Sequence, residues 1–314
     1  MNDTIVFLKP IFQERIWGGN RLSKIFNYNL TSDKIGECWG ISAHKNGDCE
    51  ITNPEYSGYT LSKLFEERKD LFNNDQSKEF PLLIKILDAN TSLSVQVHPD
   101  DEYALKYEND LGKNECWYVL DANEDAFVIY GHIAKTEVEF RSMIEQGKWD
   151  DLLIKKHVKK GDFINVPAGT IHALGAGLLI LETQQSSDTT YRLYDYDRTD
   201  DKGNKRQLHI EESIRVSTIP HVEKQVHFDV HTMGDNTFTK LVKNEFFIVE
   251  KWDIKTSVTL NHNLYRLCSV IDGTGKINGL KIKKGDHFII TSLLNEFTLE
   301  GDFSLITSTV GSIK

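Results

Sequence analysis

Short apolar stretches bounded by turn-forming residues constrain the fold of this chain more than any other feature. The clearest of them lie at residues 81–89, 117–122, 126–133 and 177–185. Each is flanked by Gly, Asn or Asp, a pattern typical of short buried strands in a β-sandwich or a barrel. We therefore expect a mainly β protein.

Helical periodicity is confined to three segments, at residues 61–72, 138–156 and 209–217. Their apolar side chains recur at the spacing that places them on or near one face of a helix. We expect these segments to be helices attached to the β core.

An internal repeat indicates that the β architecture occurs twice. Residues 159–164 read KKGDFI and residues 283–289 read KKGDHFI, with one inserted histidine. Repeated β units indicate repeated architecture. The first copy continues into VPAGTIHALG, whereas the second has lost the proline, the glycine and the histidine. We expect two related β-barrels, of which the first is equipped for chemistry.

The boundary between the two barrels is expected in the polar stretch around residues 221–240, which carries turn signals and little helical pattern. This gives a catalytic domain at residues 1–235. It also gives a C-terminal β-domain without metal ligands at residues 236–314.

Charge and cysteine content exclude several classes of protein. The net charge of −10 argues against nucleic-acid binding, which needs a basic face, although a few local cations can still bind a small anion. No apolar run is long enough to span a membrane, and the N-terminus does not read as a signal peptide, so we expect neither feature. The four cysteines lack CxxC spacing, so we expect reduced thiols in a cytoplasmic protein; they are Cys38, Cys49, Cys116 and Cys268.

Two pairs of polar residues are spaced to share one face of a strand. Gln96 and His98 alternate with two valines, and Lys113 and Glu115 are also two residues apart. Since alternate residues of a strand point to the same side, each pair is expected to project together. His172 follows two predicted turns and begins another strand.

Two histidines and one carboxylate from different strands suit a divalent metal. Imidazole nitrogen and carboxylate oxygen both bind Zn²⁺ at about 2.0–2.2 Å. The amide oxygen of Gln96 is a weaker fourth candidate, and such a set leaves room for water or substrate, as in catalytic sites. Alone, each residue has an ordinary explanation, such as a hydrogen-bonded core histidine or a Lys113–Glu115 surface pair. Their joint occurrence in strand-like frames favours the metal site.

The same residues carry a family resemblance. The run from Gly161 through Pro167 and Gly169 to His172 is similar to the second cupin motif. Gln-x-His followed by Lys-x-Glu resembles the pattern of the type I mannose-6-phosphate isomerase family. The next block of that family also has counterparts here, which are His172-Ala173, Gly177, Glu182, Ser187-Asp188 and Arg192.

The resemblance is to the short bacterial branch of this family. It is strong over residues 5–200 and includes IWGG at 16–19 and residues 80–89, whereas residues 240–314 resemble the C-terminal cupin-like domain with weaker identity. Leu-Gly-Lys-Asn-Glu replaces the Asn-His-Lys-Pro-Glu block of larger members, and the Gly-Leu-Thr-Pro run after the family arginine is absent. The large helical insert of longer members is reduced.

The resemblance implies a cupin (jelly-roll) barrel with attached helices and a second, degenerate cupin-like β-domain. It implies one divalent metal ion, with Zn²⁺ as the first choice, held by Gln96, His98, Glu115 and His172. The implied reaction interconverts mannose 6-phosphate and fructose 6-phosphate through an enediol, and a small sugar phosphate is then the partner. We expect a monomer or a small homo-oligomer.

The resemblance also implies roles for residues around the metal. The catalytic residues expected are Arg192, Glu182 and Lys113, and the substrate-binding residues are Lys113, Arg192, Asp188 and Lys85, with Arg198 as a further candidate. Glu182 is the first choice as the base because it lies in an apolar strand, where burial raises the pKa of a carboxyl group. Asp188 and Lys113 are the alternatives. Two other functions stay open, a non-catalytic sugar-phosphate-binding cupin and an Fe(II) oxygenase.

Overall fold

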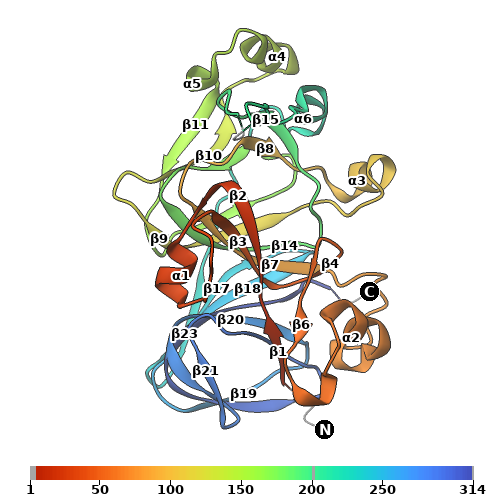
Figure 1. The fold of residues 1–314 in the computed structure, drawn as a ribbon, viewed down its shortest axis with the longest axis vertical. Coiled ribbons are helices and arrows are strands. Elements are labelled where there is room, and N and C mark those ends of the chain that lie inside the picture. The colour runs from red at the N-terminus through yellow and green to blue at the C-terminus, as the bar shows by residue number, and fades with distance from the viewer. Residues whose placement is uncertain (1–4, 200–201, 313–314) are drawn as a thin grey trace.

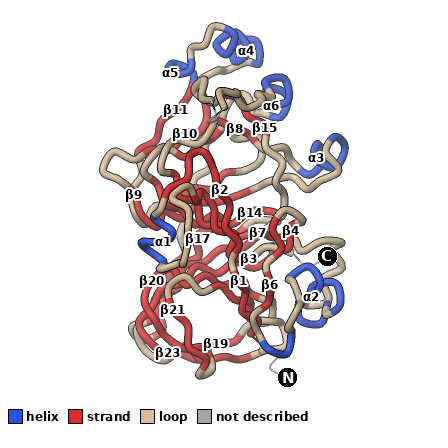
Figure 2. The backbone as a smooth tube through the Cα atoms, viewed as in Figure 1, coloured by secondary structure: helices blue, strands red, loops and turns tan. Residues whose placement is uncertain are grey.

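The computed structural model describes residues 5–199 and 202–312. Strands dominate it, and they form two barrel-like bodies, one above the other in the view of Figure 1. Helices lie at the periphery, as Figure 2 shows by colour. The prediction of a mainly β protein is confirmed. None of the helices in the described residues is long and apolar enough to cross a membrane.

The first barrel is built from a six-stranded and a five-stranded sheet. The six-stranded sheet has the order β12 (Phe163–Val166), β9 (Glu115–Ala122), β14 (Leu178–Gln185), β7 (Leu82–Ala89), β3 (Ile35–Ile41) and β2 (Ile11–Gly19). The five-stranded sheet has the order β11 (Leu153–His157), β10 (Phe127–His132), β13 (His172–Leu174), β8 (Val95–Val97) and β15 (Tyr191–Tyr194). A short hairpin pairs β4 (Ala43–His44) with β5 (Gly47–Asp48).

A ten-stranded sheet forms the second barrel. Its main path is β16 (Asp229–Met233), β17 (Asn236–Lys243), β18 (Phe247–Ile254), β23 (Glu296–Val310), β20 (Arg266–Ile277), β22 (His287–Ile290), β1 (Ile5–Lys9) and β6 (Glu50–Ile51). Two more strands pair at its side, β19 (Val258–Asn261) with β23 and β21 (Leu280–Lys283) with β20. The first described strand of the chain thus lies in the sheet of the C-terminal half, and the division at residue 235 stays a proposal.

The helices are short. They are α1 (Arg21–Phe26), α2 (Leu61–Glu67), α3 (Asp101–Tyr107), α4 (Glu137–Glu145), α5 (Trp149–Leu152) and α6 (Ile210–Val216), with 3₁₀ turns η1 (Pro54–Tyr56) and η2 (Lys69–Phe72). The helix expected at 209–217 is confirmed as α6, whereas the one at 61–72 is interrupted at Arg68. The single helix expected at 138–156 is wrong, because Gly147 adopts φ +65° after α4 and residues 153–157 pair with β10 as a strand.

The two copies of the repeat form the same turn. Gly161 and Gly285 both adopt φ +92°, which a glycine reaches without steric cost. Their N–H groups donate to equivalent carbonyls, those of Val119 on β9 and Val270 on β20, both at 2.9 Å. The strand order β12-β9-β14-β7 in the first barrel corresponds to β22-β20-β23-β18 in the second. The prediction of two related barrels is therefore confirmed.

Strand β14 lies between the two barrels and is buried along its whole length. Leu179 and Leu181 belong to the apolar cluster shared with the second barrel, whereas Ile180 packs in the interior of the first. The alternation of a strand therefore turns Glu182 toward the interior of the first barrel. Burial on both faces explains why this segment reads as a continuous apolar run. The four cysteines are also buried and free.

Candidate metal centre and active site

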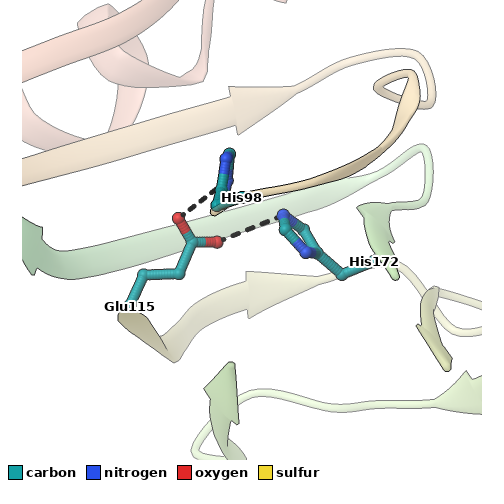
Figure 3. Close-up of side chains that lie close together, drawn as sticks. All are labelled: His98, Glu115 and His172. Atoms are coloured by element: carbon teal, nitrogen blue, oxygen red, sulfur yellow. Dashed lines mark ion pairs between the residues drawn. The ribbon is translucent and has the colours of Figure 1, made fainter. Parts of the chain in front are cut away.

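Three strands of the first barrel bring two histidines and a glutamate together. His98 follows β8, Glu115 begins β9 and His172 begins β13 (Figure 3). Nε2 of His98 lies 3.3 Å from Oε2 of Glu115, and Nε2 of His172 lies 3.4 Å from Oε1. All three side chains are buried. Their potential ligand atoms lie within 4.8 Å of one another, so one ion could contact all of them.

Hydrogen bonds to the backbone orient both imidazoles. Nδ1 of His98 lies 3.0 Å from the carbonyl oxygen of Thr189, and Nδ1 of His172 lies 2.8 Å from that of Thr170. A carbonyl oxygen only accepts, so Nδ1 carries the proton and the Nε2 lone pair of each ring points toward Glu115, that of His98 also toward Lys113. Burial lowers the pKa of His98 to about 3 and also lowers the pKa of His172. Both rings are therefore neutral at pH 7, as metal ligands must be.

The environment of the Glu115 carboxylate indicates that these three side chains suit a metal ion. Its Oε1 atom is buried and has no hydrogen-bond partner among the described residues. Burial alone would raise the pKa of Glu115, but Lys113 and the two histidines hold it well below its usual range. A buried, ionised oxygen without a partner is costly. A divalent cation would satisfy it, and two imidazoles with one carboxylate are a suitable donor set.

The side chains of His98, Glu115 and His172 are called the metal group below. Gln96 and Lys113 lie beside it. Nε2 of Gln96 lies 3.3 Å from Nε2 of His172, so a half-turn of the amide would present its oxygen at the same place. Nζ of Lys113 donates to Oε2 of Glu115 at 2.6 Å and lies 3.0 Å from Nε2 of His98. Burial would lower the pKa of Lys113, but Glu115 and Glu182 outweigh it and raise this pKa. The structure thus places both residues where the sequence pattern predicts them.

Glu182 lies on the same interior face. Its Oε2 atom accepts a hydrogen bond from Nε1 of Trp117 at 2.9 Å. Burial, followed by repulsion from Glu115, raises the pKa of Glu182 to about 7. Glu182 does not face solvent, because only 3% of it is exposed. A carboxyl group that titrates near neutral pH can exchange protons with a substrate.

Lys85 faces Glu182 across the β7–β14 pair. It is 4% exposed, and its ammonium lies 4.6 Å from the ring centroid of Trp39 and 3.9 Å from Oδ1 of Asp188. Within residues 5–199 and 202–312, Nζ of Lys85 makes no hydrogen bond. Asp188 also accepts from Nδ2 of Asn46 at 3.1 Å. A buried ammonium without an acceptor is ready to bind a substrate oxygen.

The pairing of neighbouring strands places Arg192 next to the site. It is paired with Gln96, which is paired in turn with His172. Residues opposite one another in a sheet share a face, so Arg192 lies on the same face as these two. Its Nε atom donates to Oγ of Ser94 at 3.2 Å. Arg198 lies further out and donates from Nη1 to the carbonyl of Ser92 at 2.5 Å.

The sequence reasoning missed a buried pair on β3. Oε2 of Glu37 accepts from Nε1 of Trp39 at 2.6 Å, and both carboxylate oxygens accept from Arg15. Burial would raise the pKa of Glu37, but Lys85 and Arg15 lower it. Trp39 in turn lies under the ammonium of Lys85. The sequence did contain a sign of this pair. Glu37 and Trp39 are two residues apart, like Lys113 and Glu115, and this spacing places both on one face of a strand.

Comparisons with known proteins agree with this geometry. Residues 5–142 match the model "Phosphomannose isomerase type I, catalytic domain", and residues 237–310 match "Mannose-6-phosphate isomerase, cupin domain". A mannose-6-phosphate isomerase of Streptococcus mutans is 51% identical over 308 residues, which cover 96% of this chain and 97% of that protein. Mannose-6-phosphate isomerase ManA of Bacillus subtilis is 48% identical over 309 residues, covering 96% and 98%.

Solved structures give the same result. The mannose 6-phosphate isomerase of Bacillus subtilis superimposes with a TM-score of 0.95 at 43% identity, covering 97% of this chain and 99% of that one. A putative mannosephosphate isomerase of Archaeoglobus fulgidus shares the fold, with a TM-score of 0.78 at 18% identity and 98% of both chains covered. The resemblance predicted from Gln96, His98 and Glu115 is confirmed. The chain belongs to the type I mannose-6-phosphate isomerase family.

Proposed function

We propose that this enzyme interconverts mannose 6-phosphate and fructose 6-phosphate through an enediol, with a divalent metal, Zn²⁺ as first choice, held by His98, Glu115 and His172 and assisted by Gln96. The observation that carries this proposal is the Oε1 atom of Glu115, which has no hydrogen-bond partner among the described residues and lies 3.4 Å from Nε2 of His172. When bound, the ion supplies positive charge that orients the two sugar oxygens and stabilises their negative charge.

Glu182 is the proposed base. Moving a proton between C2 and C1 requires a group that takes it from one carbon and returns it to the neighbouring one. A carboxyl group with a pKa of about 7 is available in both protonation states at neutral pH, which suits both halves of this transfer. The hydrogen bond from Trp117 fixes one carboxylate oxygen, so the other is left to face the substrate.

Two lysines act on the sugar oxygens in this scheme. The ammonium of Lys85 makes no hydrogen bond within the described residues and is held between the Trp39 ring and Asp188, from where it can donate to a hydroxyl or an enediolate oxygen. Lys113 stays charged beside Glu115 and can donate to a second oxygen. Asp188 orients Lys85, and Arg192 extends the site toward the phosphate end.

The family membership favours this reaction over the two alternatives, a binding cupin and an Fe(II) oxygenase. The decisive experiment is a coupled assay of fructose 6-phosphate formed from mannose 6-phosphate, before and after chelation. Single metals are then added back, and oxygen uptake is followed in parallel. We expect turnover that is lost on chelation and restored by a divalent ion, with Zn²⁺ tested first. A folded protein that shows no turnover with any metal would refute the proposal.

A further inference from the structure

Two arginines bind a buried aspartate that follows β15, and a third arginine lies on that strand. Asp195 is 4% exposed, and the arginine cluster consists of Arg192, Arg198 and Arg206. We propose that Arg206 is a substrate-binding residue that contacts the phosphate group together with Arg192 and Arg198, and that Asp195 is the positioning residue that holds Arg198 and Arg206 in place. This inference rests on the proposed function, because it assigns the phosphate end of the same substrate.

Asp195 holds two guanidinium groups in fixed geometry. Arg206 donates from Nε to Oδ2 at 2.8 Å and from Nη2 to Oδ1 at 2.6 Å. Arg198 donates from Nη2 to Oδ1 at 2.5 Å. A bidentate arginine–carboxylate pair is planar and well defined. Each of these two side chains remains about a quarter exposed, at 24% for Arg198 and 27% for Arg206, so a small ligand can reach them.

Donors in the cluster remain available. In the part of the chain that the structure describes, neither Nη1 of Arg206 nor Nη2 of Arg192 makes a hydrogen bond. The other nitrogens of Arg192 bond to Oγ of Ser94 and the carbonyl of Gln207. Guanidinium donors without acceptors, in side chains that are already fixed, are a suitable arrangement for phosphate oxygens.

The net charge of the arginine cluster also favours binding of a dianion. The cluster has three guanidinium groups and one carboxylate, which leaves an excess of two positive charges. Burial, and then the positive charges of Arg206 and Arg198, lower the pKa of Arg192, whereas the charge of Asp195 acts in the opposite direction. A phosphate monoester carries about −1.5 to −2 charges at neutral pH. Such a group would neutralise the cluster.

The cluster lies at a suitable place relative to the metal group. Arg192 is opposite Gln96 in register, and it contacts Ser94, two residues before Gln96. Two residues of chain span at most about 7 Å, so the Arg192 side chain starts beside the metal ligands. Arg198 contacts Ser92, a further two residues away. A sugar with C1 and C2 at the metal group would extend its C6 phosphate toward this cluster.

The segment that carries Arg206 is anchored to β15. The backbone N–H of His209 donates to the carbonyl of Arg192 at 2.8 Å, and the N–H of Arg192 donates to Nδ1 of His209 at 3.2 Å. At its other end, Thr199 forms a bridge with Lys205. Arg206 is therefore held between two fixed points. It lies fourteen positions after Arg192, which is why the family pattern ending at Arg192 did not predict it.

The test compares Arg206→Ala with Arg215→Ala, which removes an exposed arginine on α6 outside the site. In steady-state kinetics, we expect Arg206→Ala to raise the KM for mannose 6-phosphate by about tenfold or more, as for a lost charged hydrogen bond, with kcat changed less than twofold. Arg206→Lys should recover part of the loss, because it keeps the charge without the bidentate geometry. Asp195→Asn should raise KM as well, whereas Arg215→Ala should match the wild type.

Binding of inorganic phosphate, measured by calorimetry on folded protein, separates this inference from the proposed function. Wild type that binds phosphate more tightly than Arg206→Ala supports the inference, even if the isomerase assay fails. Two results would overturn it: equal phosphate binding by the two proteins, including no binding by either, or an Arg206→Ala variant that loses kcat while its KM stays within twofold of wild type.

Discussion

Glu182 and Trp117 are joined by a hydrogen bond across β14 and β9, from the indole N–H to one carboxylate oxygen at 2.9 Å. The two residues are also direct partners in the register of these strands. This contact fixes the carboxyl group and favours its ionised form, against the burial and the Glu115 charge that raise its pKa to about 7. The balance of these effects yields the first prediction.

Trp117→Phe should shift the acidic limb of the kcat/KM profile to higher pH. The substitution removes the donor that stabilises the carboxylate, so the pKa of Glu182 rises and the base becomes ionised only at higher pH. Glu182→Gln should lower kcat by about 10²–10⁴-fold, the usual contribution of a general base. Both are measured with the coupled assay between pH 5.5 and 9. An unchanged limb in Trp117→Phe would argue against Glu182 as the group that titrates.

Removal of the metal should destabilise the wild-type protein. A ligand that binds only the folded state adds about 2.7 kcal/mol when present at one hundred times its dissociation constant. We expect chelation to lower the thermal midpoint of the wild type. The change should be much smaller in His172→Ala, which lacks one of the three proposed ligands. Scanning fluorimetry with and without chelator measures this, and an equal shift in both proteins would contradict the assignment of His172.

His287 should make the second barrel sensitive to acid. Its ring is buried, with Nδ1 at 2.8 Å from Oγ of Ser269 and Nε2 at 3.0 Å from the hydroxyl of Tyr28. Burial lowers the pKa of His287 to about 4. In the unfolded chain the ring takes up a proton near pH 6.5, so the unfolded state binds more protons between these values. The contribution of His287 to stability is therefore constant well above pH 6.5 and falls as the pH drops toward 4.

Urea unfolding at pH 7.5 and pH 5 tests this prediction. Linkage gives a loss of about 2 kcal/mol from this one group over that interval. His287→Gln should show a pH-dependent loss smaller than that of the wild type by this amount, because the other histidines contribute equally to both proteins. The same pH dependence in both proteins would show that folding does not lower the pKa of His287.

Thr183 and Ser308 connect the two barrels. Their hydroxyl oxygens lie 2.9 Å apart, and both residues are fully or almost fully buried. Thr183→Val should lower the free energy of unfolding by about 1–3 kcal/mol, since it leaves the Ser308 hydroxyl without its partner. The double variant Thr183→Val with Ser308→Ala should be closer to the wild type. Denaturant unfolding of the four proteins measures the coupling, and strictly additive losses would contradict it.

Local periodicity was enough to predict which strand residues lie together around the candidate metal site. The alternation around Gln96 and His98, and that of Lys113 and Glu115, depends only on the two-residue repeat of a strand. The KKGD turns at Gly161 and Gly285 are also local, because their backbone conformation and the Asp hydrogen bond arise within a few residues. For such features, the neighbouring residues in the chain decide the structure.

Only the tertiary structure determined which residues of distant segments pair with one another. The register that sets Glu182 opposite both Lys85 and Trp117, the entry of β1 into the C-terminal sheet and the approach of Arg206 to Asp195 all join distant segments. Residues 153–157 became a strand, not a helix, because β10 offered them a partner. Sequence determined which residues could share a face, and long-range packing of one sheet against another determined which faces meet.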